Sequence, residues 1–225
     1  MKNIYKHLYR HKKLNIKNNY RVKLMINAIK NLKPVNQKIL DIGCFDGTLL
    51  SSLPPDNFLY GVEASDFGYK TCLKKGINVT QFFFNDDKFP YKSSSFDIII
   101  AGEIIEHIYD TDQFLNEIYR LLKPNGYLVL STPNIASLPR RIMLLLGMNP
   151  IIEISPNRLD SSGHIRYFTF KNLSKLIEEN NFNIIKIFSD LINFHPQGKI
   201  QSKLVPKILP TIGQSIICLC QKSKK

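Results

Sequence analysis

The stretch ILDIGCFDGTLL, residues 39–50, decides the fold of this chain. A short apolar run around Asp41 is broken by Gly43 and Gly47, and an apolar pair follows at once. This pattern predicts a buried strand that passes through a glycine turn into a helix, a geometry that points the helix N-terminus at a ligand. Glycine suits the turn because a side chain would hold a ligand away from the backbone. An ordinary strand-to-helix turn has the same pattern, so both interpretations stay open.

The composition is that of a soluble globular protein. The chain has 225 residues, 44% of them hydrophobic and 22% charged, which fits one α/β domain with short additions. No apolar run approaches the roughly 20 residues of a membrane-spanning helix. The basic N-terminus lacks the apolar core and cleavage site of a signal peptide. The four cysteines show neither disulfide nor zinc spacing, and we therefore expect a cytoplasmic protein.

The positive charge lies at the two ends of the chain. Residues 1–33 hold ten Lys or Arg and no acid, and residues 186–225 hold seven Lys and one acid, out of a total net charge of +13. The body between them is slightly acidic. Basic ends suit an anionic membrane surface or a polyanionic partner, and they also suit solubility alone. The acidic body makes a nucleic-acid groove less favoured.

Predicted strands and helices alternate along the chain, which indicates a doubly wound, mainly parallel, seven-stranded α/β sheet. The domain is predicted to span residues 34–225, preceded by a basic helical extension over residues 1–33. The predicted strands are residues 38–43, 58–63, 79–84, 96–101, 127–131, 182–189 and 215–221. The predicted helices are residues 1–32, 46–53, 66–75, 111–122 and 171–180.

Ligands of such sheets bind outside the carboxyl ends of the strands. Glu63 ends the second strand, where an acid can accept two hydrogen bonds from a ribose diol. A dinucleotide is the obvious candidate ligand, but its G-x-G-x-x-G fingerprint fails here. Phe45 and Thr48 occupy the second and third glycine positions.

Five segments in this order resemble the class I S-adenosylmethionine-dependent methyltransferases, a family with a Rossmann-like fold. They are ILDIGCFDG, YGVEAS, FDIIIAGEIIEHI, LLKPNGYLVLSTPN and GHIRYFTFKNLSKLI, and the resemblance covers most of the chain from Lys38 onward. It implies S-adenosylmethionine as the cofactor. The implied cofactor-binding residues are Asp41, Gly43, Cys44, Gly47, Glu63, Asn85, Asp86 and Gly102. Two residues depart from the family pattern. Phe45 replaces the middle glycine of the loop and narrows the room for the carboxylate end of the cofactor. Asn125 replaces the second glycine of the usual turn before the fifth strand.

A second stretch, Glu103 to His107, carries the candidate chemistry. If its backbone is helical, then Glu103, Glu106 and His107 share one face and form half of a divalent-metal site, for which His164 is the candidate further ligand. The sequence resembles ubiquinone-biosynthesis O-methyltransferases and small-RNA 2′-O-methyltransferases, which carry such a Glu-x-x-Glu-His…His set. The metal would be Mg²⁺ or Mn²⁺. Glu-His also occurs in methyltransferases without a metal, where the His107 equivalent would act as a base or orient the acceptor. Glu106, His107 and His164 are the predicted catalytic residues.

Residues 133–163 correspond to the segment that usually covers the acceptor in this family. Arg140 and Arg141 precede the apolar run Ile142 to Leu146. Such a segment can lie in a membrane interface, form a lid over an apolar substrate, or pack as an ordinary helix. In the ubiquinone-type enzymes a comparable segment meets the membrane, and the resemblance therefore implies a peripheral membrane contact.

The function predicted from the sequence is S-adenosylmethionine-dependent O-methylation of a small-molecule or lipid-linked acceptor, such as a polyphenol, a quinone precursor or an envelope sugar. The alternative is an RNA 2′-O-methyltransferase that uses the Glu-Glu-His-His metal site. The acidic body and the lack of a recognisable RNA-binding module argue against this alternative.

Overall fold

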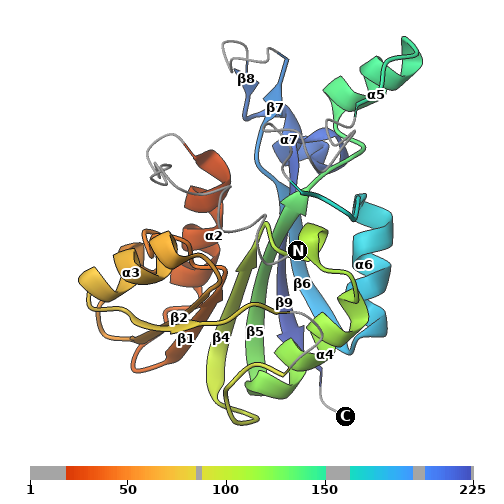
Figure 1. The fold of residues 1–225 in the computed structure, drawn as a ribbon. Helices are drawn as coiled ribbons and strands as arrows, with labels where there is room; N and C mark the ends of the chain where they lie inside the picture. The colour runs from red at the N-terminus through yellow and green to blue at the C-terminus, as the bar shows by residue number, and fades with distance from the viewer. Residues whose placement is uncertain (1–18, 85–87, 151–162, 195–200, 224–225) are drawn as a thin grey trace.

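The computed structural model describes residues 19–84, 88–150, 163–194 and 201–223, and its centre is a seven-stranded sheet with the order β3-β2-β1-β4-β5-β9-β6 (Figure 1). The strands are β1 Lys38–Ile42, β2 Phe58–Glu63, β3 Asn78–Gln81, β4 Phe96–Gly102, β5 Leu122–Pro133, β6 Phe182–Ser189 and β9 Ser215–Lys222. Strand β9 is antiparallel to both neighbours, and the other pairs are parallel. The predicted doubly wound, mainly parallel α/β fold is confirmed.

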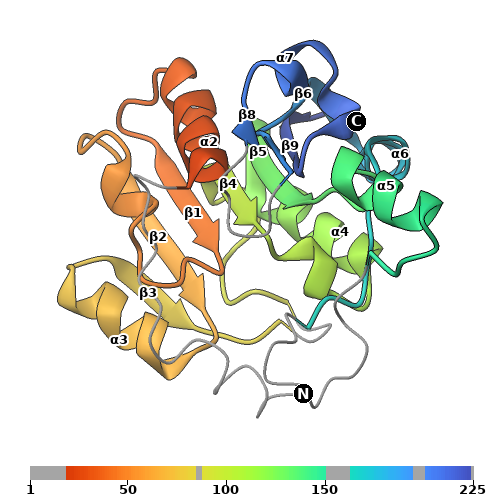
Figure 2. The same cartoon turned by 90° about the horizontal axis from the view of Figure 1, so that it is seen from above.

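Helices cover both faces of the sheet (Figure 2). The helices are α2 Tyr20–Asn31, α3 Asp66–Lys74, α4 Thr111–Leu121, α5 Leu138–Leu145, α6 Phe170–Glu179 and α7 Val205–Ile208. Helices α2 and α3 pack on one face, and α4 and α6 pack on the other. Helices α5 and α7 lie at the end of the molecule toward which the arrow of β5 points (Figure 1), together with a short ribbon of β7 Ile192–Asn193 and β8 Gln201–Ser202.

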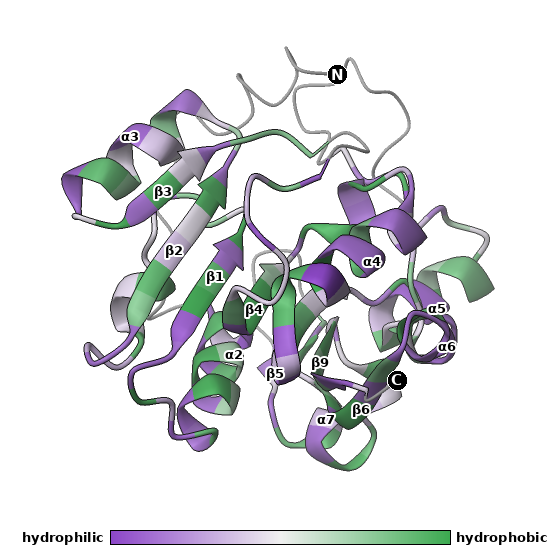
Figure 3. Ribbon diagram, turned by 90° about the horizontal axis from the view of Figure 1, so that it is seen from below, coloured by the Kyte–Doolittle hydropathy of each residue, from purple (hydrophilic) through white to green (hydrophobic). Residues whose placement is uncertain are grey.

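The sheet divides the hydrophobic core into two layers. Alternate residues of the buried strand β4 serve both layers, because Ile99 faces α4 and α6 while Ile98 and Ile100 face α2 and α3. Figure 3 shows hydrophobic residues along the strands and mixed colours on the surrounding helices. A sheet covered on both faces explains why the strands read as continuous apolar runs.

Helix α2 belongs to this core. The side chain of Asn19 caps the helix by accepting a hydrogen bond from the Val22 N–H at 3.1 Å. Val22, Met25, Ile26 and Ile29 follow at helical spacing and are all buried against the sheet. The described part of the predicted basic extension therefore packs as part of the domain, and residues 1–18 lie outside the described residues.

The helix predicted over residues 46–53 is wrong, since only Leu50–Ser52 forms a single 3₁₀ turn there. Side chains compete with the helical hydrogen bonds in this segment. The Asp46 carboxylate accepts the Thr48 N–H at 3.0 Å, and the Ser51 hydroxyl donates to Gly47 O at 2.9 Å. The chain after β1 is therefore a loop rather than a helix N-terminus.

Other boundaries differ less. Strand β3 ends at Gln81 rather than at residue 84, and α4 ends at Leu121 because β5 begins at Leu122, five residues before the predicted start. Asn125 adopts a φ of 60° within β5, a conformation that asparagine tolerates better than most residues.

The packing of α2 predicts the effect of Ile29→Ala. Ile29 is 0% exposed, and its truncation should lower the free energy of unfolding by about 2–5 kcal/mol through lost burial and a cavity. Urea unfolding followed by circular dichroism measures this value. Asn27→Ala on the exposed side of the same helix is the control and should stay within about 0.5 kcal/mol of wild type. Equal stabilities of the two variants would contradict the placement of α2 in the core.

Candidate active site

A cavity of about 420 Å³ lies at the carboxyl ends of β1, β2 and β4. Its lining includes the predicted residues Asp41, Gly43, Cys44, Glu63, Gly102, Glu103 and His107. Gly47 does not line it: its φ is +70°, and a Cβ there would lie 2.2 Å from Ile77 Cδ1, so this glycine serves the turn and its packing. Asn85 and Asp86 lie outside the described residues. The neighbouring Phe82, Phe83 and Phe84 line the cavity.

The Glu63 carboxylate holds two loops at the mouth of the cavity together. Its Oε2 accepts the Phe45 N–H at 2.8 Å, and its Oε1 accepts the Ser65 N–H at 2.7 Å. Gly68 gives the carboxylate its space, because a Cβ at this position would lie 2.7 Å from Glu63 Cγ. Each carboxylate oxygen keeps a second lone pair, with which it can accept a hydrogen bond from a ligand hydroxyl.

Phe45, the residue that departs from the family pattern, lines the cavity without filling it. Its φ of 48° lies in the left-handed region, where glycine would be the ordinary choice. Its hydrogen bond to Glu63 and the contact of its ring with Phe67, at 6.0 Å between centroids, hold it in this conformation.

Sequence reasoning missed Arg21. This residue of α2 lines the cavity, its Nη1 lies 2.7 Å from Glu103 Oε2, and its buried Nε has no hydrogen-bond partner among the described residues. One indication of this placement is present in the sequence: Arg21 directly precedes Val22, the first of the apolar residues that α2 buries. Arg21 places an N–H donor and a positive charge beside the cavity.

The helical backbone assumed for Glu103 to His107 is not present. Glu103 has a φ of 57°, and only Ile105–His107 forms a 3₁₀ turn. The left-handed conformation directs Glu103 to Arg21 and to the hydroxyl of Ser131, which donates at 3.3 Å. Burial raises the pKa of Glu103, and Arg21 partly offsets this shift.

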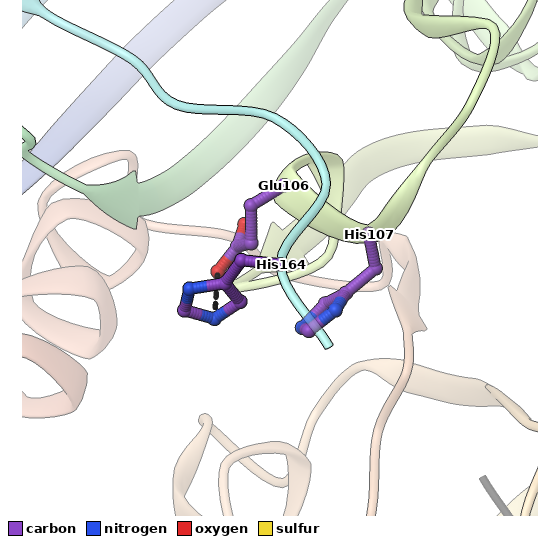
Figure 4. Close-up of side chains that lie close together, drawn as sticks. All are labelled: Glu106, His107 and His164. Carbon is purple, nitrogen blue, oxygen red and sulfur yellow. Dashed lines mark ion pairs between the residues drawn. The ribbon is translucent and has the colours of Figure 1, made fainter. Parts of the chain in front are cut away.

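Glu106, His107 and His164 do come together (Figure 4). One ligand atom from each residue lies within 4.8 Å of the others. The segment that carries His164 is fixed to the 3₁₀ turn, because the N–H groups of Ile165 and Arg166 donate to Glu106 O at 2.9 and 3.0 Å. His107 Nδ1 lies 3.0 Å from Gly163 O. Residues 57 positions apart in the chain thus form one cluster, without Glu103 among its members.

The Glu106 carboxyl group is buried and incompletely satisfied. Its Oε2 accepts the Thr132 hydroxyl at 2.9 Å, whereas its Oε1 has no hydrogen-bond partner among the described residues and lies 3.9 Å from His164 Nε2. Burial raises the pKa of Glu106 to about 8, and the negative charge of Glu103 adds to the shift. A proton or a cation would satisfy the buried Oε1 of Glu106. Together with the imidazoles of His107 and His164, this oxygen forms a set of ligands that can hold a divalent ion.

Asp41 gives the site a testable dependence on pH. Burial raises the pKa of Asp41 well above its ordinary value, with the charges of Cys72 and Glu63 adding to the shift. The folded protein therefore keeps a proton that the unfolded chain releases above about pH 4, and wild-type stability should fall as the pH rises from there through the raised pKa. Asp41→Asn removes this titration, so its stability relative to wild type should increase between pH 5 and pH 8 in urea unfolding.

The control for this prediction is Asp56→Asn, which changes an exposed acid. Its stability should follow the wild-type dependence on pH. Parallel curves for Asp41→Asn and wild type would show that Asp41 is not buried as described.

Comparisons with known proteins agree with this geometry. A methyltransferase-domain family matches residues 15–187 of the chain. The ubiquinone biosynthesis O-methyltransferase of Pelagibacter ubique is 28% identical over 198 residues, which are 83% of this chain and 75% of that protein. The mitochondrial ubiquinone biosynthesis O-methyltransferase of Homo sapiens is 25% identical over 187 residues, which are 75% of this chain and 48% of the human protein. The chain therefore spans about half the length of the human relative.

Solved structures show the same fold. A methyltransferase of Thermotoga maritima described as S-adenosylmethionine-dependent has a TM-score of 0.65 at 20% identity, and the match covers 90% of this chain and 89% of that chain. An N-methyltransferase of Burkholderia thailandensis with bound S-adenosylhomocysteine has a TM-score of 0.59 at 12% identity, with 92% and 80% covered. This chain belongs to the methyltransferase-domain family, and it is a Rossmann-like S-adenosylmethionine-dependent methyltransferase.

Proposed function

We propose that this enzyme transfers a methyl group from S-adenosylmethionine to a hydroxyl oxygen of a quinone precursor. The observation that carries the proposal is the cluster of Glu106, His107 and His164, which meets the cofactor cavity through His107. The names of the relatives support the acceptor class. A base and a cation site beside the cofactor suit an oxygen acceptor, because a hydroxyl must lose its proton during transfer.

The residues of the cavity fit the cofactor. Glu63 can accept hydrogen bonds from the two ribose hydroxyls. Gly43 lines the cavity at a turn where its φ of +73° and the nearby Ile104 Cδ1 leave no room for a side chain. The Arg21 Nε–H, which has no partner among the described residues, can donate to the carboxylate of the methionine end. The sulfonium carries a positive charge, and the buried carboxyl of Asp41 lines the same cavity. The aromatic side chains of residues 82–84 provide apolar surface for the adenine.

His107 is the proposed base. When Nδ1 donates its proton to Gly163 O, the lone pair of the ring lies on Nε2, which can accept the proton of the acceptor hydroxyl. The methyl group moves by in-line displacement, so the remaining task of the protein is to align the acceptor oxygen with the sulfonium.

Glu106, His107 and His164 are also the proposed holders of a divalent cation. His107 Nε2 has one lone pair, so when the cation is bound Nε2 coordinates it, and the cation then takes over from His107 the task of easing loss of the acceptor proton. Support comes from the buried Oε1 of Glu106, which has no hydrogen-bond partner in the described part of the chain, and from the two imidazoles within 4.8 Å. Imidazole ligands favour Mn²⁺ over Mg²⁺. A bound cation would lower the pKa of a coordinated acceptor hydroxyl. Glu103 is not part of this set, since Arg21 holds it.

Removal of the cation should abolish activity. With a catechol-type quinone precursor and labelled S-adenosylmethionine, excess chelator should lower turnover by at least about 100-fold, and Mn²⁺ should restore it. Glu106→Ala and His164→Ala should lose Mn²⁺ binding, measured by the electron paramagnetic resonance of the free ion. Glu103→Gln is the matched control and should keep Mn²⁺ binding.

Other outcomes of these measurements would count against the proposal. Full turnover in excess chelator would overturn the cation and leave His107 as the base alone. Transfer of label into RNA but not into the quinone precursor would overturn the acceptor class.

We further propose that α5 rests on a membrane surface. Helices α5 and α7 lie at the same end of the molecule (Figure 1). Leu144, Leu145 and Leu146, at the end of α5, are 59%, 85% and 65% exposed, and Ile208 of α7 is exposed as well. No helix in the described part of the chain is long and apolar enough to cross a bilayer. Exposed leucines at the end of a helix whose first turn carries Arg140 and Arg141 suit an interfacial position, from which a lipid-soluble acceptor could enter.

Liposome flotation tests this surface. The double variant Leu144→Glu/Leu145→Glu should lose binding to vesicles that contain anionic lipid, because two charges oppose insertion of the apolar face. Leu73→Glu is the matched control, since Leu73 is 49% exposed on α3 and should leave flotation unchanged. Equal flotation of the double variant and wild type would reject the proposal.

A further inference from the structure

Two thiols meet where the cofactor loop touches α3. The Sγ atoms of Cys44 and Cys72 lie 3.6 Å apart, and Cys44 lines the cofactor cavity. We propose that Cys44 and Cys72 form an oxidisable dithiol whose disulfide lowers the affinity of the enzyme for its cofactor. This inference goes beyond the proposed function and depends neither on the acceptor nor on the cation.

The surroundings give the two sulfurs room to meet. A Cβ on Gly61 would lie 2.6 Å from Cys44 Sγ, and a Cβ on Gly47 would lie 3.0 Å from Cys72 Sγ. Both glycines therefore make space that the thiols occupy. A disulfide needs a sulfur–sulfur distance of about 2.0 Å, so the two sulfurs, 3.6 Å apart, must approach by about 1.6 Å. The cysteines come from different elements, a loop and a helix, and the loop can supply this movement.

The movement would reach the groups that hold the cofactor. Cys72 Sγ donates a hydrogen bond to Phe45 O at 3.2 Å, and Phe45 N donates to Glu63 Oε2 at 2.8 Å. Oxidation removes the Cys72 proton and with it the first of these bonds. It also pulls Cys44 toward α3, and the neighbouring Phe45 N–H shifts relative to the Glu63 carboxylate. Because binding depends on these positions to within about an ångström, the affinity should fall.

The chemistry needs an oxidant, for which we name a peroxide. Peroxide reaches the pair through the cavity that Cys44 lines. The hydrogen bond from the Cys44 thiol lowers the pKa of Cys72, so the Cys72 thiolate attacks one peroxide oxygen, breaks the O–O bond and becomes a sulfenic acid, while the leaving oxygen takes up a proton as water. The Cys44 sulfur then attacks the sulfenic sulfur, and a second water leaves with the Cys44 thiol proton. The pair loses two electrons and the peroxide gains them. A bound cofactor would cover Cys44 and slow the first step.

The chain contains its own comparison pair. Cys218 and Cys220 are also buried thiols, but they stand two residues apart on β9 and do not line the cavity. Both side chains are 0% exposed and neither lines the cavity, so peroxide has less access to them than to Cys44. We expect peroxide to spare this pair.

The experiment treats the full chain, free of cofactor, with hydrogen peroxide and maps disulfides by mass spectrometry of a non-reducing digest. The expected product is a Cys44–Cys72 linked peptide in folded protein. Calorimetry should show binding of S-adenosylhomocysteine about 10-fold weaker after oxidation and restored by dithiothreitol. Prior addition of S-adenosylhomocysteine should prevent the disulfide. Cys72→Ala should keep its affinity through peroxide treatment, and the matched variant Cys220→Ala should respond as wild type does.

Two outcomes would overturn the inference. One is the absence of the linked peptide in wild-type protein that circular dichroism shows to be folded. The other is a Cys44–Cys72 disulfide with unchanged affinity for S-adenosylhomocysteine. Both use wild-type protein, so they decide the question even if Cys72→Ala does not fold.

Discussion

The hydrogen bonds that the Glu63 carboxylate accepts from Phe45 N–H and Ser65 N–H hold the cofactor end of the sheet in shape. One carboxylate thereby joins the loop after β1 to the start of α3. The loop is also joined to β2 by the N–H groups of Gly43 and Cys44, which donate to Val62 O at 2.8 and 3.1 Å, but a charged acceptor forms a stronger hydrogen bond than a neutral one. The bond to Glu63 also keeps Phe45 in a left-handed conformation that glycine would adopt without support. The loop is thus specified by its contact with β2 as well as by hydrogen bonds of its own side chains, such as that of Asp46 to the Thr48 N–H.

A second constraint on the cavity is the burial of three carboxyl groups. Asp41, Glu103 and Glu106 all have raised pKa values, chiefly because of burial. Arg21 pairs with Glu103 and does not contact the other two through any hydrogen bond or ion pair seen in the described residues. An ionised carboxyl group costs free energy to bury unless a positive charge lies beside it. A sulfonium cofactor beside Asp41 and a divalent cation beside Glu106 would each supply a positive charge. Asp41 and Glu106 should therefore favour the binding of cations.

The sequence was sufficient for the sheet and insufficient for the loops. Apolar runs such as Phe96–Gly102 predict buried strands, because a strand whose two faces are both covered is apolar on both. The residues at their carboxyl ends, Asp41, Glu63 and Gly102, line one cavity for the same topological reason. Periodicity failed over residues 46–53 and at Glu103, where side-chain hydrogen bonds and a positive φ replace the helix. Arg21 was missed because its contact with Glu103 crosses 82 positions, and no local pattern encodes it.

The candidate catalytic cluster shows how such a distant contact is built. His164 reaches Glu106 because the N–H groups of Ile165 and Arg166 bind the carbonyl oxygen of Glu106 itself. The backbone carbonyl of Glu106 therefore positions His164, which is the neighbour of the Glu106 side chain. The 3₁₀ turn Ile105–His107 thus positions the carboxyl, the His107 ring and the His164 segment together. The Thr132 hydroxyl of β5 donates to Glu106 Oε2 at 2.9 Å, and this bond ties the cluster to the sheet whose strand ends form the cofactor cavity. The sheet therefore sets the position of the candidate base relative to the cofactor.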